Sequence, residues 1–253
     1  MNNKFKRIAV ITGATSGIGE ATARRLIAAG MGVVGNGRNE KKMALLEKEF
    51  GPSFCGVVGD ATDVSVLDAI LSKAGDHFEK PTDLVVANAG RGLGGTVTNA
   101  DLSQFEDLLK INVTGTLALL QKAALNLLEL KKSGGTENPI DIVIIGSVVG
   151  RHVSPFSAAY AASKFAVHAL AESLRREVGP EGIRVSLVEP GMVKSGFQTV
   201  AGYSDEMVKN LENKYGPLLI GDDIANAIHY IVTQPPHVHI SSIAVRPTRQ
   251  DYP

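Results

Sequence analysis

Short, strongly apolar segments alternate along the whole chain with longer segments of helical periodicity. This alternation constrains the fold more than any other feature, because consecutive parallel strands need long crossover connections, which are usually helices. Strands that are buried on both sheet faces are nearly continuous in apolar residues, as most of these segments are. The predicted strands are Arg7–Thr12, Gly32–Asn36, Phe54–Val58, Asp83–Ala87, Ile140–Gly146, Ile183–Glu189 and Ile240–Val245.

Six helices are predicted among these strands. They are Gly17–Ala29, Glu40–Phe50, Val64–Gly75, Leu102–Lys131, Ser157–Val178 and Asp222–Thr233. This pattern indicates an α/β protein with a doubly wound, mostly parallel seven-stranded sheet that carries helices on both faces. No long Pro-, Gly- or Ser-rich linker interrupts the chain, so we expect residues 1–253 to form one domain.

A glycine-rich turn joins the first predicted strand to the first predicted helix. Glycine is in excess in this chain, with 27 residues where a usage of about 7% would give roughly 18. Glycines in such a turn let the backbone approach a pyrophosphate, and the helix N-terminus offers unpaired N–H groups and a partial positive charge. The residues expected to form this cradle are Gly13, Thr15, Ser16, Gly17, Ile18 and Gly19. Its position at the start of a βαβ unit predicts a dinucleotide-binding (Rossmann) fold rather than a simple tight turn.

The end of the second predicted strand indicates which dinucleotide is bound. Sites that prefer NAD place a carboxylate there for the ribose 2′-hydroxyl, whereas this chain has Gly35-Asn36-Gly37-Arg38-Asn39. The planar guanidinium of Arg38 suits a 2′-phosphate, and Gly35 and Gly37 would leave room beside it. The alternative is that Arg38 only begins a solvated helix. We therefore predict NADP(H) as the cofactor.

Polar residues follow the third and fourth predicted strands at the carboxyl edge of the sheet, where ligands bind in this kind of fold. Asp60 is placed to accept a hydrogen bond from the adenine amino group, with Ala61 beside it. Asp63 is more natural as the N-cap of the following helix. The predicted contacts after the fourth strand are Asn88, Ala89 and Gly90.

Tyr160 and Lys164 are four residues apart in a predicted helix and therefore share one face. A tyrosine with a pKa of about 10 exchanges protons poorly at neutral pH, and a neighbouring ammonium group favours its phenolate form. Ser147 lies just past the apolar strand that precedes this helix. Asn112 lies midway along another predicted helix, where an amide is neutral to unfavourable. These four residues are the candidates for catalysis.

Together with the glycine turn, these four residues resemble the short-chain dehydrogenase/reductase family, in its compact single-domain branch. The resemblance extends over nearly the whole chain. It includes Pro190-Gly191-Met192-Val193-Lys194-Ser195, which is similar to the family's turn beside the nicotinamide. It implies that the cofactor is contacted by Pro190, Gly191, Val193 and Ser195, and also by Tyr160 and Lys164.

The resemblance also implies a role for each candidate catalytic residue. Tyr160 would act as general acid or base on the substrate oxygen, and Ser147 would hydrogen-bond that oxygen. Lys164 would lower the pKa of the tyrosine and bind the ribose, and Asn112 would keep a water molecule in a proton relay behind the lysine. The implied reaction is hydride transfer between the nicotinamide and a carbonyl or secondary alcohol substrate.

The sequence restricts the substrate only loosely. The family places its substrate lid where residues 194–217 lie. Arg91 or Arg151 is a candidate to hold an acidic group of the substrate, and a solvated loop arginine is an equally natural interpretation. The tail over residues 237–250 is similar to that of NADP-dependent 3-hydroxy-acid and serine dehydrogenases, which favours a 3-hydroxy or 3-oxo acid.

Two other functions compete with that of an oxidoreductase. A non-catalytic NADP(H) sensor on the same fold would not need Ser147, Tyr160 and Lys164 at these spacings. A serine hydrolase would need a Gly-x-Ser-x-Gly turn, and Gly146-Ser147-Val148-Val149-Gly150 has a different register. The filled catalytic positions favour an enzyme.

Charge and composition restrict the partners and the compartment. The 26 Lys and Arg residues balance 26 Asp and Glu residues, so the chain lacks the basic field typical of nucleic-acid or anionic-membrane binding. The single cysteine, Cys55, excludes an intrachain disulfide, and no signal peptide is recognised, so we expect a cytoplasmic protein. His237 and His239 have no third ligand nearby in the sequence, so no metal is predicted.

The two longest predicted helices carry more apolar surface than one sheet face needs. They span residues 102–131 and 157–178. Core packing and a subunit interface explain this surface equally well, and the second interpretation predicts a homotetramer or a dimer.

Overall fold

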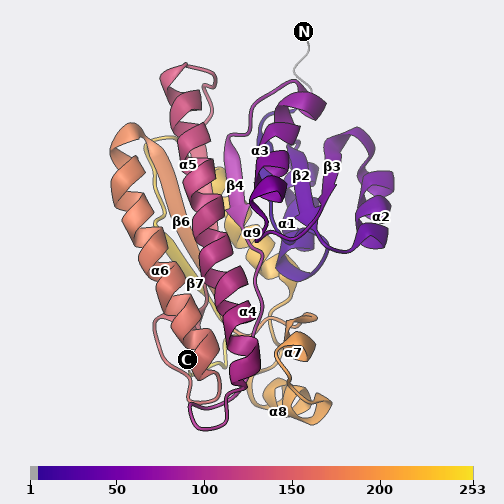
Figure 1. Cartoon of the computed structure of the whole chain (residues 1–253), viewed down its shortest axis with the longest axis vertical. Helices are drawn as coiled ribbons and strands as arrows, with labels where there is room; N and C mark the ends of the chain where they lie inside the picture. Colours follow the sequence, from indigo (N-terminus) through magenta and orange to yellow (C-terminus); the bar gives the residue numbers. More distant parts are fainter. Residues whose placement is uncertain (1–4, 253) are drawn as a thin grey trace.

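The computed structural model describes residues 5–252, which form a seven-stranded sheet with helices on both faces (Figure 1). The strands are β1 Ile8–Ile11, β2 Gly32–Gly37, β3 Phe54–Val58, β4 Leu84–Ala87, β5 Ile140–Ile145, β6 Ile183–Pro190 and β7 Ser242–Val245. Their order is β3-β2-β1-β4-β5-β6-β7, and every neighbouring pair is parallel. The predicted doubly wound fold is confirmed, and the strand order reverses between β1 and β4.

The helices cover the sheet in two groups. They are α1 Gly17–Ala28, α2 Glu40–Phe50, α3 Val64–Phe78, α4 Phe105–Leu109, α5 Thr116–Lys132, α6 Ala158–Val178, α7 Phe197–Val200, α8 Asp205–Tyr215 and α9 Gly221–Val232. One face packs against α3, α5 and α6, and the other packs against α1, α2 and α9. Alternation along β1 makes this possible, because Ile8 and Val10 join the first core whereas Ala9 and Ile11 join the second.

The predicted helix over Leu102–Lys131 is interrupted. Leu102–Gln104 forms a 3₁₀ turn, α4 follows, and Lys110–Gly115 forms a π-helical turn before α5 begins. Asn112 lies in this wider turn and is only 1% exposed. Hydrophobic periodicity does not reveal such a turn, because the chain stays helical on both sides of it.

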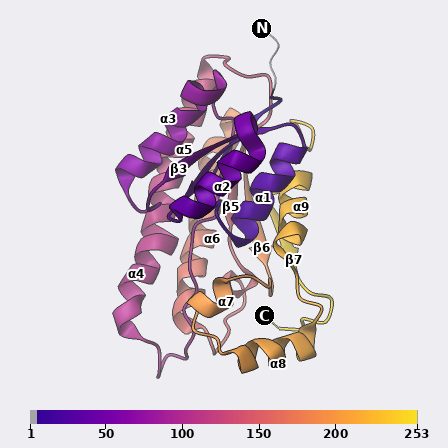
Figure 2. The same cartoon turned by 90° about the vertical axis from the view of Figure 1, so that its right-hand side faces the viewer.

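Two helices, α7 and α8, are absent from the predicted set. Both lie beyond the carboxyl ends of the strands, at the lower end of the molecule in Figures 1 and 2. Ser204 caps α8 by accepting a hydrogen bond from the Met207 N–H group. Asp205 and Glu206 in the first turn suit the positive end of the helix dipole. These helices fall within the segment 194–217, where a lid is expected.

A buried ion network joins the amino ends of four strands. Arg184 in β6 contacts both carboxylate oxygens of Asp141 in β5, at 2.7 and 2.9 Å. Arg7, just before β1, contacts Asp141 at 2.8 Å and Asp83 at 3.1 Å. All four side chains are at most 6% exposed. The amino edge of the sheet is therefore closed by charge pairing, and the carboxyl edge is the one that faces a cavity.

Two further observations concern the thiol of Cys55 and the length and apolarity of the helices. Cys55 is buried in β3 with a free thiol, and burial raises the pKa of that thiol, which keeps it protonated and unreactive. In the part of the chain that the structure describes, no helix has the length and apolarity that a membrane crossing requires.

Candidate active site

A cavity of about 810 Å³ opens at the carboxyl edge of the sheet and is lined by residues that follow most of the strands. It lies where the strand order reverses, which is the usual ligand position in open α/β sheets. Nearly all the predicted site residues lie on its wall. The exceptions are Gly19 and Asn112, so the predicted set is brought together apart from these two.

The glycine turn forms an open cradle in this wall. Gly13 and Gly17 have φ angles of +69° and +53°, which side chains rarely allow. A Cβ atom at Gly19 would lie 2.2 Å from the Gly13 carbonyl oxygen, so Gly19 permits the turn itself. Ser16, the N-cap of α1, makes no side-chain capping bond, so the first N–H groups of the helix are available to an anion. This cradle fits the diphosphate of a nicotinamide dinucleotide.

Asn88, just after β4, lines the cavity and also holds the shape of the cradle. Its side-chain nitrogen donates to the carbonyl oxygens of Thr12 and Gly13, at 2.9 and 3.3 Å. The Thr12 hydroxyl accepts from the N–H groups of Asn88 and Ala89, at 3.1 and 3.0 Å. The ends of β1 and β4 are therefore fixed to each other at the point where the cavity opens.

Arg38 and Asp60 line the end of the cavity that β2 and β3 form. Arg38 is exposed. Asp60 accepts a hydrogen bond from the Thr62 N–H group at 2.8 Å, and this bond lowers the pKa of its carboxyl group. Asp63 instead caps α3 by accepting from the Ser65 N–H group, as predicted. The carboxylate of Asp60 is thus held ionised, as an acceptor on the cavity wall.

Gly35 does not line the cavity, so it leaves no room for a ribose phosphate, contrary to the prediction, whereas Gly37 lies on the cavity wall and its predicted role stays a prediction. A Cβ atom at Gly35 would lie 2.4 Å from Cζ of Phe54, and one at Gly37 would lie 2.6 Å from the Thr15 side chain. Gly35 therefore accommodates a core aromatic ring, and Gly37 lets the end of β2 approach the cradle. Both neighbours are distant in sequence, so the strand pattern did not reveal them.

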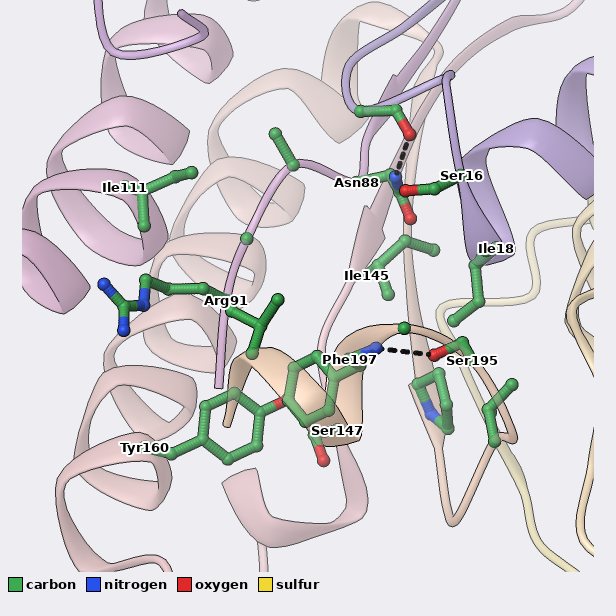
Figure 3. A pocket seen from close by; sticks show the side chains of 18 of the residues that line it. Ser16, Ile18, Asn88, Arg91, Ile111, Ile145, Ser147, Tyr160, Ser195 and Phe197 are labelled. Carbon is green, nitrogen blue, oxygen red and sulfur yellow. Dashed lines mark hydrogen bonds between the residues drawn. The ribbon is translucent and has the colours of Figure 1, made fainter. Parts of the chain in front are cut away.

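Tyr160 projects from α6 into the cavity and lies close to Ser147 and Phe197 in Figure 3. Its ring packs edge-on against Phe197 of α7, with the ring centroids 5.4 Å apart. Burial raises the pKa of Tyr160, a hydrogen bond with Ser147 lowers it, and Tyr203 raises it further. Burial dominates, so the phenol is protonated at neutral pH.

Lys164 lies near the Tyr160 ring, but burial dominates the pKa of this tyrosine, so the lowering by Lys164 stays a prediction. Its Nζ atom donates to the Ile145 carbonyl oxygen at 2.8 Å and lies 5.8 Å from the centre of the Tyr160 ring. The ammonium group is thus engaged by the end of β5, and desolvation of the phenol is the larger effect. Burial also lowers the pKa of Lys164 itself, to about 8.

Asn112 lies behind the cavity wall. Its Nδ2 atom donates to the Arg91 carbonyl oxygen (2.9 Å) and to the Ser163 hydroxyl (3.0 Å), and its Oδ1 atom accepts from the Arg91 N–H group (2.9 Å). Both amide hydrogens are therefore used, so this side chain has none left to donate to the predicted relay water. It fixes the end of β4 to α6 beside Lys164.

The two candidate arginines have different surroundings. Arg151 is exposed, does not line the cavity and donates through Nη2 to Oε1 of Glu189 at 2.7 Å, so the structure does not support it as the arginine that holds an acidic group of the substrate. Arg91 lines the cavity, on the wall that Ile111 and Tyr160 also form (Figure 3). Its Nη2 atom donates to Gln104, and its buried Nε atom has no hydrogen-bond partner within residues 5–252.

Gln250 is one of the wall residues that are missing from the predicted site. It lies 58 residues after Met192, yet its Oε1 atom accepts a hydrogen bond from the Met192 N–H group at 2.9 Å. A Cβ atom at Gly191 would lie 2.5 Å from the same oxygen. The tail therefore closes the turn that follows β6, and no local pattern in the sequence indicates this contact.

Comparison with known proteins identifies the family. The family model described as short chain dehydrogenase matches residues 7–204. The chain belongs to this family. Serine 3-dehydrogenase of Rhizobium radiobacter is 33% identical over 246 residues, which are 96% of this chain and 94% of the relative. An uncharacterised oxidoreductase of Staphylococcus epidermidis is 34% identical over 242 residues, 96% of this chain and 97% of the relative.

Solved structures agree with this assignment. The closed form of a serine dehydrogenase complexed with NADP⁺ superposes with a TM-score of 0.86 at 26% identity, covering 97% of this chain and 96% of that one. The resemblance to short-chain dehydrogenases expected from the sequence is confirmed, and the chain is an oxidoreductase of that family. Within residues 5–252 of this dehydrogenase, no group of three or more His, Cys, Asp and Glu side chains is placed to hold a metal ion.

Proposed function

We propose that this short-chain dehydrogenase transfers a hydride between NADP(H) and a small carbonyl or secondary alcohol substrate. One observation carries the proposal: Tyr160, Ser147 and Lys164 share a single cavity with the glycine cradle. Binding elements and proton-transfer groups are thus brought together in one cavity, as a hydride-transfer enzyme needs. A sensor would need the cradle alone.

The cradle at Gly13–Gly19 would hold the diphosphate, with Val193 and Ser195 beside the nicotinamide, which supplies the hydride donor or acceptor when bound. Ser147 would hydrogen-bond the substrate oxygen and stabilise the charge that develops there. Tyr160, held protonated by burial, would give its proton to that oxygen during reduction and take one back during oxidation. Lys164, buried behind the phenol, would hold ribose hydroxyls and stabilise negative charge on Tyr160.

Arg38 supports NADP(H) over NAD(H). It lies on the cavity wall after β2, where no carboxylate is present to bind a ribose 2′-hydroxyl. A guanidinium group can donate two parallel hydrogen bonds to a phosphate. The similar serine dehydrogenase structure is complexed with NADP⁺, which agrees with this preference.

Arg91 supports a substrate with an acidic group, such as a 3-hydroxy or 3-oxo acid. It is half-buried on the wall that Tyr160 shares, and its Nε atom is unpartnered within the described residues. An unpaired buried donor on a cation is costly, and a carboxylate would satisfy it. The similarity to serine 3-dehydrogenase agrees with this class of substrate.

We also propose that residues 194–217 act as a lid and that α5 and α6 form a subunit interface. Phe197 of α7 already covers Tyr160.

The proposed subunit interface lies on α5 and α6, where the apolar side chains of Leu117, Leu125 and Phe165 are 49%, 63% and 42% exposed. Light scattering would test the homo-oligomer, and a monomeric mass would contradict it. The cytoplasmic location stays a prediction.

The deciding experiment is an NADPH-oxidation screen over ketones, aldehydes, 3-oxo acids and their neutral esters. We expect turnover, with the acids preferred over their matched esters. NADPH binding without turnover of any compound would instead support the sensor. In Arg91→Met the preference for acids should disappear while activity on the esters remains, and an unchanged preference would contradict the role of Arg91.

A further inference from the structure

The ring of His168 lies in a space beside Ser147 that exists because two neighbouring residues are glycines without side chains. Gly146 and Gly150 flank Ser147, and a Cβ atom at either glycine would lie 2.4 Å from Nε2 of His168. His168 lies on α6, one turn beyond Lys164 and two turns beyond Tyr160. The Gly-Ser-Val-Val-Gly run, which has the wrong register for a hydrolase, is therefore shaped around an imidazole.

A hydrogen bond joins this ring to the main chain of Ser147. The Ser147 N–H group donates to Nε2 of His168, with 3.3 Å between the nitrogen atoms. A backbone N–H group can only donate, so Nε2 must be the unprotonated nitrogen and the ring proton must lie on Nδ1. Nδ1 faces Oε2 of Glu189 at 4.0 Å. The contact thus selects one neutral tautomer.

A buried carboxylate and an exposed arginine complete the arrangement. Glu189 in β6 is fully buried, and Arg151 donates to both of its oxygens through Nε and Nη2. The same Nη2 atom donates to the Ser242 hydroxyl at 3.2 Å, which fixes the guanidinium group. A chain of polar contacts therefore runs from Arg151 through Glu189 and His168 to Ser147.

We propose that His168 is a positioning residue, whose neutral ring holds the main chain of Ser147 so that the serine hydroxyl faces Tyr160 and the substrate oxygen. The inference rests on the proposed function. The contact acts on the peptide nitrogen of Ser147, whereas the serine hydroxyl accepts from the Val149 N–H group at 3.4 Å and hydrogen-bonds with Tyr160. One helix thus presents the proton donor, the ammonium group and the residue that orients the serine.

The charged groups around His168 are compatible with a neutral ring. Burial lowers the pKa of His168 to about 4, Glu189 from β6 raises it, and Lys164 and Arg151 lower it. Because the ring stays neutral above this value, Nε2 remains an acceptor at the pH values at which the enzyme would work. Protonation of Nε2 would place its N–H group opposite the Ser147 N–H group. Because two donors cannot hydrogen-bond to each other, the contact would break.

Two variants separate positioning from packing. His168→Leu removes the acceptor, and we expect kcat to fall about 10- to 100-fold, with little change in the KM of the ketone or in the Kd of NADPH. His168→Gln keeps an oxygen near the place of Nε2, and we expect it to recover most of kcat. Wild-type kcat in His168→Leu would overturn the proposal. So would an equal loss in His168→Gln when NADPH binding is intact.

A measurement on the wild-type protein does not depend on these variants or on turnover. In ¹⁵N-histidine-labelled enzyme, assigned by comparison with His168→Gln, His168 should show an unprotonated Nε2 and a protonated Nδ1 from pH 7 down to pH 5. An Nε2–H tautomer, or titration near the ordinary histidine pKa of 6.5, would overturn the proposal. If the wild type shows this tautomer and no carbonyl is reduced, the proposed function fails while the contact stands.

Discussion

Tyr160 is the side chain on which the proposed chemistry depends most directly. Burial holds its phenol protonated, and the ring packs against Phe197. Tyr160→Phe keeps the ring and removes only the proton that would be transferred. We expect kcat to fall by about 10²- to 10⁴-fold, because general acid catalysis contributes a factor of this size. Steady-state kinetics and a fluorescence titration with NADPH measure the two effects separately, and NADPH affinity should be retained.

A second phenol on the same wall provides the matched control. Tyr203 is half-buried, like Tyr160, and Tyr203→Phe removes a hydroxyl without removing the proposed proton donor. Its kcat should fall far less than that of Tyr160→Phe. Undiminished turnover in Tyr160→Phe would exclude this residue as the acid.

Arg38 decides the choice between the two nicotinamide cofactors in our proposal. Arg38→Asp replaces a phosphate-binding fork by a carboxylate that repels a 2′-phosphate and accepts from a 2′-hydroxyl. We expect the Kd of NADPH to rise at least about tenfold, since hydrogen bonds to charged groups contribute about 1.5–3 kcal/mol. NADH binding should improve. Lys41→Asp makes the same charge change on exposed α2 and should leave the NADPH/NADH ratio unaltered, whereas an unaltered ratio in Arg38→Asp would refute the assignment.

At the scale of elements, a glycine-to-alanine substitution should have opposite effects in two places. These are the turn between β1 and α1 and the helix α3. A Cβ atom at Gly19 would lie 2.2 Å from a carbonyl oxygen, whereas one at Gly75 in α3 would meet nothing within 4 Å. Gly19→Ala should therefore distort the cradle and abolish NADPH binding. Gly75→Ala should stabilise the protein by about 0.5–1 kcal/mol, because alanine loses less backbone entropy in a helix.

Denaturant unfolding and NADPH titration of both variants test this contrast. Gly75→Ala should bind NADPH as the wild type does, which makes it the control for the substitution itself. Tight NADPH binding by Gly19→Ala would show that the turn tolerates a side chain and that the cradle is not built as described.

The stability of the whole molecule should depend on pH through Lys164. Its pKa is lowered from 10.5 to about 8 by burial, so the folded state binds fewer protons than the unfolded state between these two values. The free energy of unfolding of the wild type should therefore rise through this window, and below pH 8 the buried charge costs about 3 kcal/mol. Lys164→Met removes this cost. It also removes the hydrogen bond to the Ile145 carbonyl oxygen, which offsets part of the gain in stability.

We expect Lys164→Met to be inactive and yet more stable than the wild type at pH 7, by about 1–3 kcal/mol. The difference should shrink as the pH rises from 8 towards 10.5. Urea unfolding of both proteins at pH 7 and pH 9.5 measures it, because pH effects of other groups are common to both. A difference that stays constant between these pH values would mean that buried Lys164 keeps its proton over this range, as it does in the unfolded chain, and that burial does not lower its pKa.

The sequence by itself determined the order of the strands and of the helices that cover the sheet, the glycine turn and about half of the residues that line the cavity. These depend on local patterns: apolar runs, a glycine turn between a strand and a helix, and Tyr160 and Lys164 on one helical face. In a parallel sheet the carboxyl ends of the strands meet at one edge, so residues that follow successive strands come together wherever the fold is known.

Tertiary structure alone decided what each of these residues touches. Asn112 bonds Arg91 and Ser163 rather than lining the cavity, Arg151 pairs with Glu189, and Lys164 donates to Ile145. Each contact joins elements that are far apart in sequence. The balance between burial and charge at Tyr160 also depends on the packed surroundings. Desolvation is a property of the folded environment, and no spacing along the chain encodes it.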